Sequence, residues 1–412
     1  MNSKLSIATV ACAALVLAAC GGRSDVNPNS SSAVRCDTGI TDTTIKFGSS
    51  SPQSGAGAAY GALAQTAKKY FDTLNADGGV QMGDGKQRKV ELTVTDDAYD
   101  PARTVSNVRE LVDKTGVFGL FIVLGTSPNE AIGDYVNAKA IPNLFMSTGA
   151  DIFLEQHKEK PWNMAWLPQY GWEAKVLADY VVQNRPDAKV GVLYQNDGYG
   201  KAIMAGLQTA LKGTSVKIVS AQGYEQSGGT ADAQVSKLKA SGADVFINYA
   251  TGTFVTQSLK KAADLGWKPL IIIGSGNNHA SLIGPAGKDA VKGAVTFNWL
   301  KDVADTSWAN DAGMKAWQAF AEKNGVDPAD GASANGYTMA QVMVKTLEAT
   351  DGCKRSDLLD AVQHLKGAKA DLLLPGVSVS TSADYPYFIN VVQMLEFDGT
   401  RWVAKGDAIK RK

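Results

Sequence analysis

The sequence contains few of the side chains that enzymes use for acid–base or metal chemistry. Only three histidines occur in 412 residues, His157, His279 and His364, and none has acidic or thiol neighbours at the spacing of metal ligands. The chain also lacks a Gly-x-Ser-x-Gly turn, a phosphate-binding loop with Gly-Lys-Ser/Thr, and a His-Glu-x-x-His segment. The sequence therefore predicts a protein that is not an enzyme and that holds no metal and no cofactor.

Neither sign of charge is in excess, since 41 Lys and Arg residues balance 41 Asp and Glu residues. Such a chain has no bulk charge with which to attract nucleic acid, so no nucleic-acid partner is expected. Beyond residue 20, no apolar run reaches the length of a membrane span. The remaining body, roughly 370 residues, is long enough for two domains.

The longest apolar segment, residues 5–19, follows Lys4 and ends in small residues before Cys20. It is too short to cross a bilayer comfortably, and its ending resembles the bacterial lipobox. That resemblance implies cleavage before Cys20 and acylation of its thiol; the alternative is an uncleaved helix with an incidental cysteine. We expect a signal peptide over 1–19, a lipidated flexible linker over 20–41, and a protein anchored through lipid on the extracytoplasmic face of a bacterial membrane.

Two cysteines remain after the signal peptide and the lipidated residue are set aside. In an oxidising compartment, Cys36 and Cys353 most simply pair with each other as a disulfide. Two separate buried thiols are the alternative.

The body alternates short β-rich runs with longer helical patterns, which is typical of parallel sheets covered on both faces. A first series has strands at 44–49, 90–95, 118–124 and 141–146 and helices at 59–75, 101–114 and 129–138. A second series has helices at 172–184, 200–212, 231–241 and 254–265 and strands at 190–194, 216–221, 245–249 and 270–273. After a strand at 295–298 come helices at 309–324, 335–349 and 356–365 and a hairpin over 388–404. The pattern predicts an α/β fold with two doubly wound parallel-sheet lobes, between which the chain crosses more than once.

Three loops at predicted strand ends are small, hydroxylated and rich in N–H groups. They cover residues 50–61, 125–129 and 147–150. Ligands of parallel α/β sheets bind beyond the carboxyl ends of the strands, where these groups suit a carboxylate. Tyr60 and Tyr199 lie on Gly-flanked turns and are expected to close over a ligand from opposite lobes. Trp162 and Trp166 either border such a pocket or pack between the lobes.

Several segments resemble the branched-chain amino-acid-binding family, the substrate-binding proteins of ABC importers with a type I periplasmic-binding fold. The resemblance covers about 42–407 and is carried by residues 78–80, 96–101, 141–150, 161–168, 192–201 and 397–402. It implies two lobes joined by a three-strand hinge, with residues 42–167 and 300–375 in the first and 168–299 and 376–412 in the second. It also implies a monomer with ABC permease subunits and a small-molecule ligand as partners. The residues expected to bind that ligand are Tyr60, Thr126, Ser127, Thr148, Gly149, Tyr199, Tyr249, Thr251 and Ser275.

One departure from the family concerns the ligand's charge. Members that bind amino acids often place an acid after the strand at 270–273, where this chain has Gly274-Ser275-Gly276-Asn277. A buried ammonium without a carboxylate partner would cost several kcal/mol. Asp97 either substitutes for the missing acid or caps local structure. The resemblance therefore leaves open an amino acid or an aromatic or aliphatic acid as ligand, and a sensor or an exported Rossmann-like oxidoreductase as alternative functions.

Overall fold

The computed structural model of the protein describes residues 35–411. The predicted signal peptide, Cys20 and the linker up to residue 34 lie outside the described residues. The compact unit begins at Cys36, which forms a disulfide with Cys353. Next to it, the Asp37 N–H donates to the Cys353 carbonyl at 3.1 Å, and Ile40 is buried. Residues 36–41, which the sequence assigns to the linker, are therefore attached to the folded unit.

The first sheet has six strands and is parallel except at one edge. Its order is β2-β3-β1-β4-β5-β6, and only the β2–β3 pair is antiparallel. The strands are β1 (Thr44–Ser51), β2 (Val80–Gln81), β3 (Gln87–Asp96), β4 (Gly119–Phe121), β5 (Asn143–Met146) and β6 (Asn163–Ala165). The central strands β4 and β5 are buried on both faces, as expected for a sheet with helices on each side.

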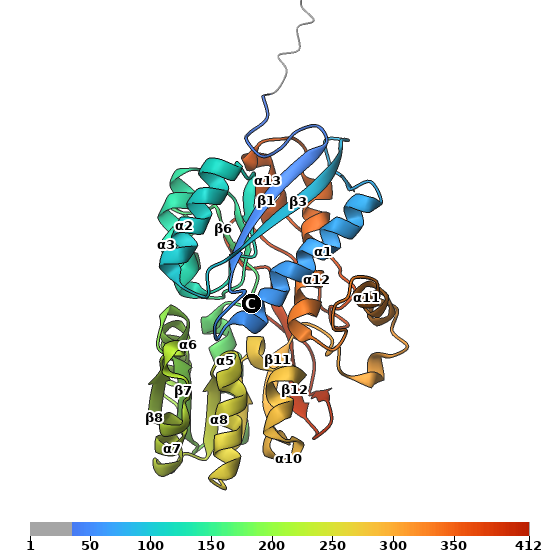
Figure 1. Ribbon diagram of the computed structural model, residues 1–412. Helices are drawn as coiled ribbons and strands as arrows, with labels where there is room; N and C mark the ends of the chain where they lie inside the picture. The colour runs from blue at the N-terminus through green and yellow to red at the C-terminus, as the bar shows by residue number, and fades with distance from the viewer. Residues whose placement is uncertain (1–34, 412) are drawn as a thin grey trace, which may run out of the picture. The chain divides into compact units, whose positions relative to one another are not determined.

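The helices that follow these strands are η1 (Ala58–Gly61), α1 (Ala62–Ala76), α2 (Pro101–Glu110), η2 (Leu111–Thr115), α3 (Thr126–Ala138) and α4 (Ile152–Glu155). Helix α2 begins as its sequence predicts, with Pro101 in the first turn and the Asp100 carboxylate accepting from the Ala102 N–H. Figure 1 shows α2 and α3 on one side of β1 and β3, and α1 on the other.

The second sheet has a parallel part and an antiparallel edge. Its order is β13-β12-β11-β10-β9-β7-β8, with β14 paired to β12. The strands are β7 (Lys189–Gln195), β8 (Lys217–Tyr224), β9 (Val245–Tyr249), β10 (Leu270–Ile273), β11 (Val295–Asn298), β12 (Val391–Phe397), β13 (Trp402–Ala404) and β14 (Ile409–Lys410). Strands β11, β12 and β13 pair antiparallel, which agrees with the hairpin that the sequence predicts.

The helices of this part are α5 (Tyr170–Asn184), α6 (Gly198–Leu211), η3 (Gln226–Gly228), α7 (Asp232–Ala240), α8 (Thr253–Asp264), η4 (Ser275–Asn277), α9 (Ala280–Ile283), η5 (Gly284–Ala286) and α10 (Lys288–Val291). We call the second sheet with these helices the second lobe. The first sheet with α1 to α4 is the first lobe.

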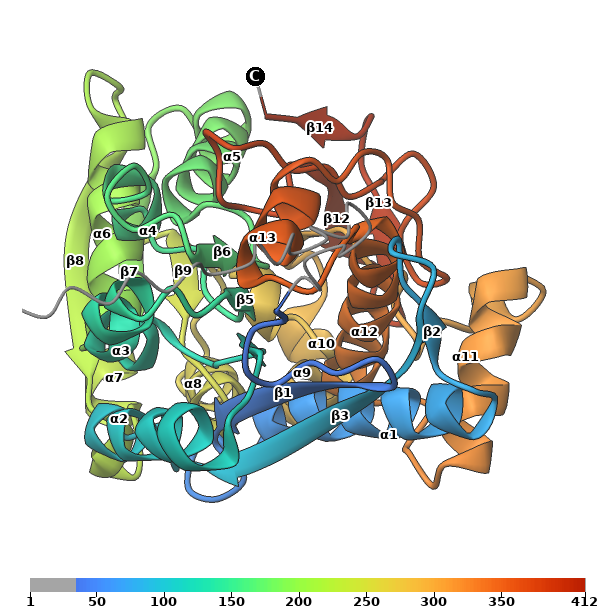
Figure 2. The same ribbon diagram turned by 90° about the horizontal axis from the view of Figure 1, so that it is seen from above.

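The chain returns to the first lobe after β11. It forms η6 (Thr306–Trp308), α11 (Ala312–Lys323), α12 (Gly331–Ala349) and α13 (Arg355–Gln363). Helix α12 packs against α1, as Figure 2 shows, so closely that a Cβ atom at Gly336 would lie 2.2 Å from the Leu63 carbonyl oxygen. The crossing segments pair with one another through bridges between Leu300 and Leu373 and between Ala165 and Tyr387. The prediction of two α/β lobes with repeated crossings is confirmed.

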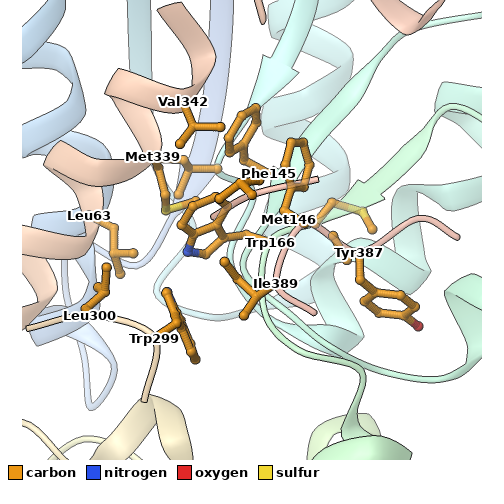
Figure 3. Packing of buried hydrophobic residues seen from close by; sticks show 14 of the residues in the cluster. Leu63, Phe145, Met146, Trp166, Trp299, Leu300, Met339, Val342, Tyr387 and Ile389 are labelled. Atoms are coloured by element: carbon orange, nitrogen blue, oxygen red, sulfur yellow. The ribbon is translucent and has the colours of Figure 1, made fainter. Parts of the chain in front are cut away.

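Large buried side chains gather where these crossings meet the first sheet (Figure 3). The Trp166 ring is fully buried and stacks on Phe145 with centroids 5.6 Å apart. Its Nε1 donates to Asn335 Oδ1 at 2.9 Å, which satisfies the one polar atom of the ring. Trp166 is therefore a packing residue. Trp299 and Leu63 belong to the same cluster and lie at its end nearest the space between the lobes.

Within residues 35–411, none of the helices combines the length and the apolar character needed to cross a bilayer.

Candidate ligand-binding site

A cavity lies where the strand ends of the two lobes face each other. The space open to the centres of water-sized spheres is about 90 Å³. Leu63, Leu167 and Trp299 form an apolar part of the wall, and hydroxyl and amide groups form the rest; among the described residues the wall includes no Lys or Arg. A small ligand with an apolar body and a few polar groups suits this space.

Several of the residues predicted from the sequence line this cavity: Tyr60, Thr126, Tyr199, Thr251 and Ser275. They come from both lobes and from positions far apart in the chain, so only the fold brings them together.

The other predicted residues lie behind the wall or at its edge. Thr148 is buried, with its Oγ1 2.8 Å from Thr126 Oγ1. The Gly149 carbonyl accepts from the Tyr170 N–H at 2.7 Å. Ser127 lies at the rim, where its Oγ accepts from the Gly198 N–H of the second lobe at 3.2 Å. Tyr249 is fully buried behind Ser275 and the start of α5. These residues support the wall, and a direct ligand contact for them stays a prediction.

The first-lobe wall includes the N-terminal end of α3. Gly125, just before the helix, has a φ of 101°, and a Cβ atom there would lie 2.5 Å from the Tyr99 ring. Only glycine fits both conditions. Asn129 Nδ2 donates to the Gly125 carbonyl at 2.7 Å, which fixes the turn. The first N–H groups of a helix carry partial positive charge, so this end of the cavity is suited to a carboxylate.

Tyr60 connects the two lobes across the cavity. Its hydroxyl donates to Asn277 Oδ1 at 2.7 Å and accepts from the Gly252 N–H at 2.8 Å. Burial raises the pKa of Tyr60 to about 12, opposed by the Gly252 N–H, so the hydroxyl stays protonated and can donate. Asn277 Nδ2 in turn donates to the Tyr199 hydroxyl at 3.1 Å. The two tyrosines are therefore joined through one amide.

The sequence analysis missed Asn277, although it singled out the loop that carries it. Of that loop, only Ser275 is among the predicted binding residues. Asparagine is a common turn residue, so its presence in a Gly-Ser-Gly-Asn turn does not point to a binding site. Its amide connects the lobes only because Tyr60 approaches it from the first lobe.

A second missed residue is Glu173 in the first turn of α5. It lines the cavity and is 2% exposed. Its Oε1 accepts from the Ser275 N–H at 3.1 Å and its Oε2 from the Ser275 hydroxyl at 2.9 Å. Burial raises the pKa of Glu173, while Ser275 and the Tyr249 hydroxyl act in the opposite direction. The sequence has no acid after β10, but the fold supplies one to the same place from α5.

Three tyrosines surround this carboxyl group, and we call them the phenol cluster: Tyr170, Tyr199 and Tyr249. The Tyr170 and Tyr199 rings meet edge to face at 5.3 Å, and those of Tyr199 and Tyr249 at 6.3 Å. Burial raises the pKa of all three phenols, and the Glu173 charge raises it further. The cluster therefore stays neutral and offers hydroxyl groups rather than charge.

Asp97 is buried and its oxygens serve the first lobe. They accept from Ser50 Oγ at 2.8 Å, from Thr104 Oγ1 at 3.0 Å and from the Tyr99 N–H at 2.9 Å. Of the two interpretations of Asp97, the structure supports the local cap.

The family described as Periplasmic binding protein matches residues 44–384, so the chain belongs to that family. A relative in Brucella abortus (strain 2308), Leu/Ile/Val-binding protein homolog 8, is 26% identical over 331 residues, which covers 78% of this chain and 80% of the relative. The family implies an extracytoplasmic location and binding rather than catalysis, so the prediction that the chain is not an enzyme is confirmed.

Solved structures with the same fold are described with different ligands. A branched chain amino acid ABC transporter from Thermus thermophilus with bound valine superposes with a TM-score of 0.77 at 18% identity, covering 90% of this chain and 98% of that one. A fatty acid ABC transporter substrate-binding protein from Thermomonospora curvata gives 0.76 at 20% identity, with coverage of 93% and 96%. A solute binding protein from R. palustris in complex with 4-hydroxybenzoate gives 0.72 at 18% identity, with coverage of 89% and 97%. These similarities confirm the predicted type I fold and leave the ligand of this chain undecided.

Proposed function

We propose that the chain is the solute receptor of an ABC importer and that it captures a small carboxylate-bearing ligand between its lobes. The observation that carries this is the cavity itself, enclosed by both lobes and walled by hydroxyl and amide groups. The ligand carboxylate lies at the start of α3, against the hydroxyl of Thr126 and the helix N–H groups. The valine and 4-hydroxybenzoate named with two of the structural neighbours are ligands of this chemical kind.

Binding works through closure of the two lobes. A ligand closes the protein only if it stabilises the closed form more than the open form. The Tyr60 hydroxyl bonds to Asn277 and Gly252 exist only when the lobes are together. The closed monomer then docks on the permease subunits.

The receptor is held at the extracytoplasmic face of the membrane by lipid on Cys20. Metabolic labelling with a fatty acid analogue tests this, with Cys20→Ala as the unlabelled comparison. The oxidising compartment also favours the Cys36–Cys353 disulfide.

Isothermal titration of the purified folded part with amino acids, benzoate-type acids and fatty acids tests the binding function. Saturable binding of a carboxylate, with a decrease in radius of gyration by small-angle scattering, is the expected result. Absence of binding by every class would refute the proposal.

A further inference from the structure

Two side-chain amides in the cavity wall have oxygens that other groups already occupy. Asn298, the last residue of β11, accepts with its Oδ1 from the Trp299 N–H at 2.8 Å and the Leu300 N–H at 3.1 Å. Asn335, in α12, accepts with its Oδ1 from Trp166 Nε1 at 2.9 Å. Backbone N–H groups and an indole only donate, so they fix the orientation of both amides. Each asparagine therefore has only its Nδ2 group, a donor, left for a further partner.

The Trp299 indole adds another donor to the same wall. Trp299 lines the cavity and is 2% exposed, and its Nε1 has no hydrogen-bond partner in the part of the chain that the structure describes. Within that part, no acceptor meets Asn298 Nδ2 or Asn335 Nδ2 either. We call these groups the donor set: Asn298 Nδ2, Trp299 Nε1 and Asn335 Nδ2. A buried donor without an acceptor is unfavourable, so the set favours a ligand that accepts hydrogen bonds.

The donor set lies away from the start of α3. Asn298 ends β11, Trp299 begins the crossing to the first lobe, and Asn335 belongs to α12. Figures 1 and 2 show α3 and α12 on opposite sides of β1. The described wall contains no Lys or Arg, and burial lowers the pKa of His279, so that ring is neutral. The donor set therefore attracts an acceptor through hydrogen bonds and without a positive charge.

We propose that Asn298, Trp299 and Asn335 together bind an uncharged carbonyl oxygen of the ligand. The inference rests on the proposed function and narrows it: the ligand is a small carboxylic acid with an aldehyde, ketone or amide carbonyl at the end opposite its carboxylate.

The chemistry of the donor set favours a carbonyl over the other oxygen groups. A carbonyl oxygen has two lone pairs and no hydrogen, so it accepts from two of these donors and needs no acceptor in return. A hydroxyl group also has to place its own hydrogen, and the donor set offers it no acceptor. A second carboxylate would be buried without a cation, which is costly.

The test compares acids in which only the carbonyl oxygen is replaced by a CH2 group of similar shape. The pairs are 4-oxopentanoate with 4-methylpent-4-enoate, 4-formylbenzoate with 4-ethenylbenzoate, and 4-acetylbenzoate with 4-isopropenylbenzoate. Isothermal titration at neutral pH gives the ratio of affinities within each pair. In the wild-type protein the carbonyl member of at least one pair binds at least about 10-fold more tightly, because the CH2 member leaves buried donors unpaired.

Terephthalate tests whether the acceptor is uncharged. It carries a second carboxylate where 4-formylbenzoate carries its aldehyde. Weaker binding of terephthalate than of 4-formylbenzoate is expected, since the described wall has no Lys or Arg to balance a second charge. Tighter binding of terephthalate would overturn the uncharged class.

Trp299→Phe and Asn335→Ala each remove one donor, and each lowers the ratio at least about threefold. A general loosening of the fold weakens both members of a pair and leaves their ratio unchanged. Trp267→Phe is the matched control: it also removes an indole donor, which bonds to the Ala243 carbonyl at 3.0 Å within the second lobe, and it keeps the wild-type ratio. Binding of the CH2 member shows that a variant is folded; if one variant binds neither member, the other decides.

The outcomes separate this inference from the proposed function. If both members of every pair bind the wild type equally, the role of the donor set is refuted while the receptor function stands. The same holds if the wild-type ratio survives in both Trp299→Phe and Asn335→Ala. If no carboxylate of any kind binds, both proposals fail.

Discussion

The Tyr60 hydroxyl is the clearest place at which to test closure, because a single oxygen atom connects the lobes. Tyr60→Phe removes the bonds to Asn277 Oδ1 and to the Gly252 N–H and keeps the ring. Gly252 has a φ of 53°, and a Cβ atom there would lie 2.6 Å from the Ala56 carbonyl oxygen, so the crowded backbone cannot easily turn its N–H to another partner. The variant therefore leaves an orphaned donor in the closed form only.

Each lost hydrogen bond is worth about 0.5–1.5 kcal/mol, so the closed form loses about 1–3 kcal/mol. Since about 1.4 kcal/mol is a factor of ten, ligand affinity should fall roughly 5- to 150-fold. The cores of the separate lobes do not use this hydroxyl. The melting temperature without ligand should therefore stay within about 2 °C of the wild type.

Isothermal titration with whichever carboxylate binds best measures the affinity, and small-angle scattering measures closure. Tyr135→Phe is the control. It also removes a tyrosine hydroxyl and its hydrogen bond, which goes to Asp113 at 2.8 Å, but this bond lies within the first lobe. Affinity equal to the wild type would refute the role of Tyr60 in closure. So would a loss of ligand-free stability as large as the loss of binding energy.

Further predictions concern pH, the disulfide and the turn before α3. Burial raises the pKa of Glu173 above its ordinary 4.5. The ligand-free wild type, compared with Glu173→Gln, is therefore most stable below pH 4.5, and its free energy of unfolding falls as the pH rises through the raised pKa. Thermal melts of the two proteins across pH check this, and parallel curves for the two proteins would contradict it. Replacing Cys36 and Cys353 by Ser opens a loop of 317 residues and lowers the free energy of unfolding by at most about 5–6 kcal/mol, measured by denaturant unfolding; an unchanged midpoint would argue that the thiols do not pair. Gly125→Ala forces a side chain against the Tyr99 ring and weakens ligand binding at least about tenfold by titration, because the start of α3 must shift; unchanged affinity would place the ligand carboxylate elsewhere.

Local patterns predicted most of the elements because their causes are local. Strand β9 has the predicted bounds of 245–249, since four of its five residues are apolar or β-prone and the run between two helices is too short for a helix of its own. The α2 start follows from Asp100 and Pro101 for the same reason. Strand β4 is shorter than the predicted 118–124, because Ile122 has a φ of 58° and leaves the ladder. No sequence pattern predicts that an isoleucine will adopt a backbone conformation with positive φ.

The α/β alternation, the hydroxyl-rich strand ends and the absence of catalytic groups follow from the sequence alone, since each depends on residues close together in the chain. Which side chains meet depends on the fold. From the sequence, Glu173 is an acid in the first turn of a helix, where the helix dipole favours it. In the fold it contacts Ser275, 102 residues away, and lines the cavity. The sequence alone indicates a turn residue at Asn277, and only the fold shows that Tyr60 from the other lobe donates a hydrogen bond to it. Contacts between lobes depend on how two separate sheets face each other, and the pattern of neither sheet contains that information.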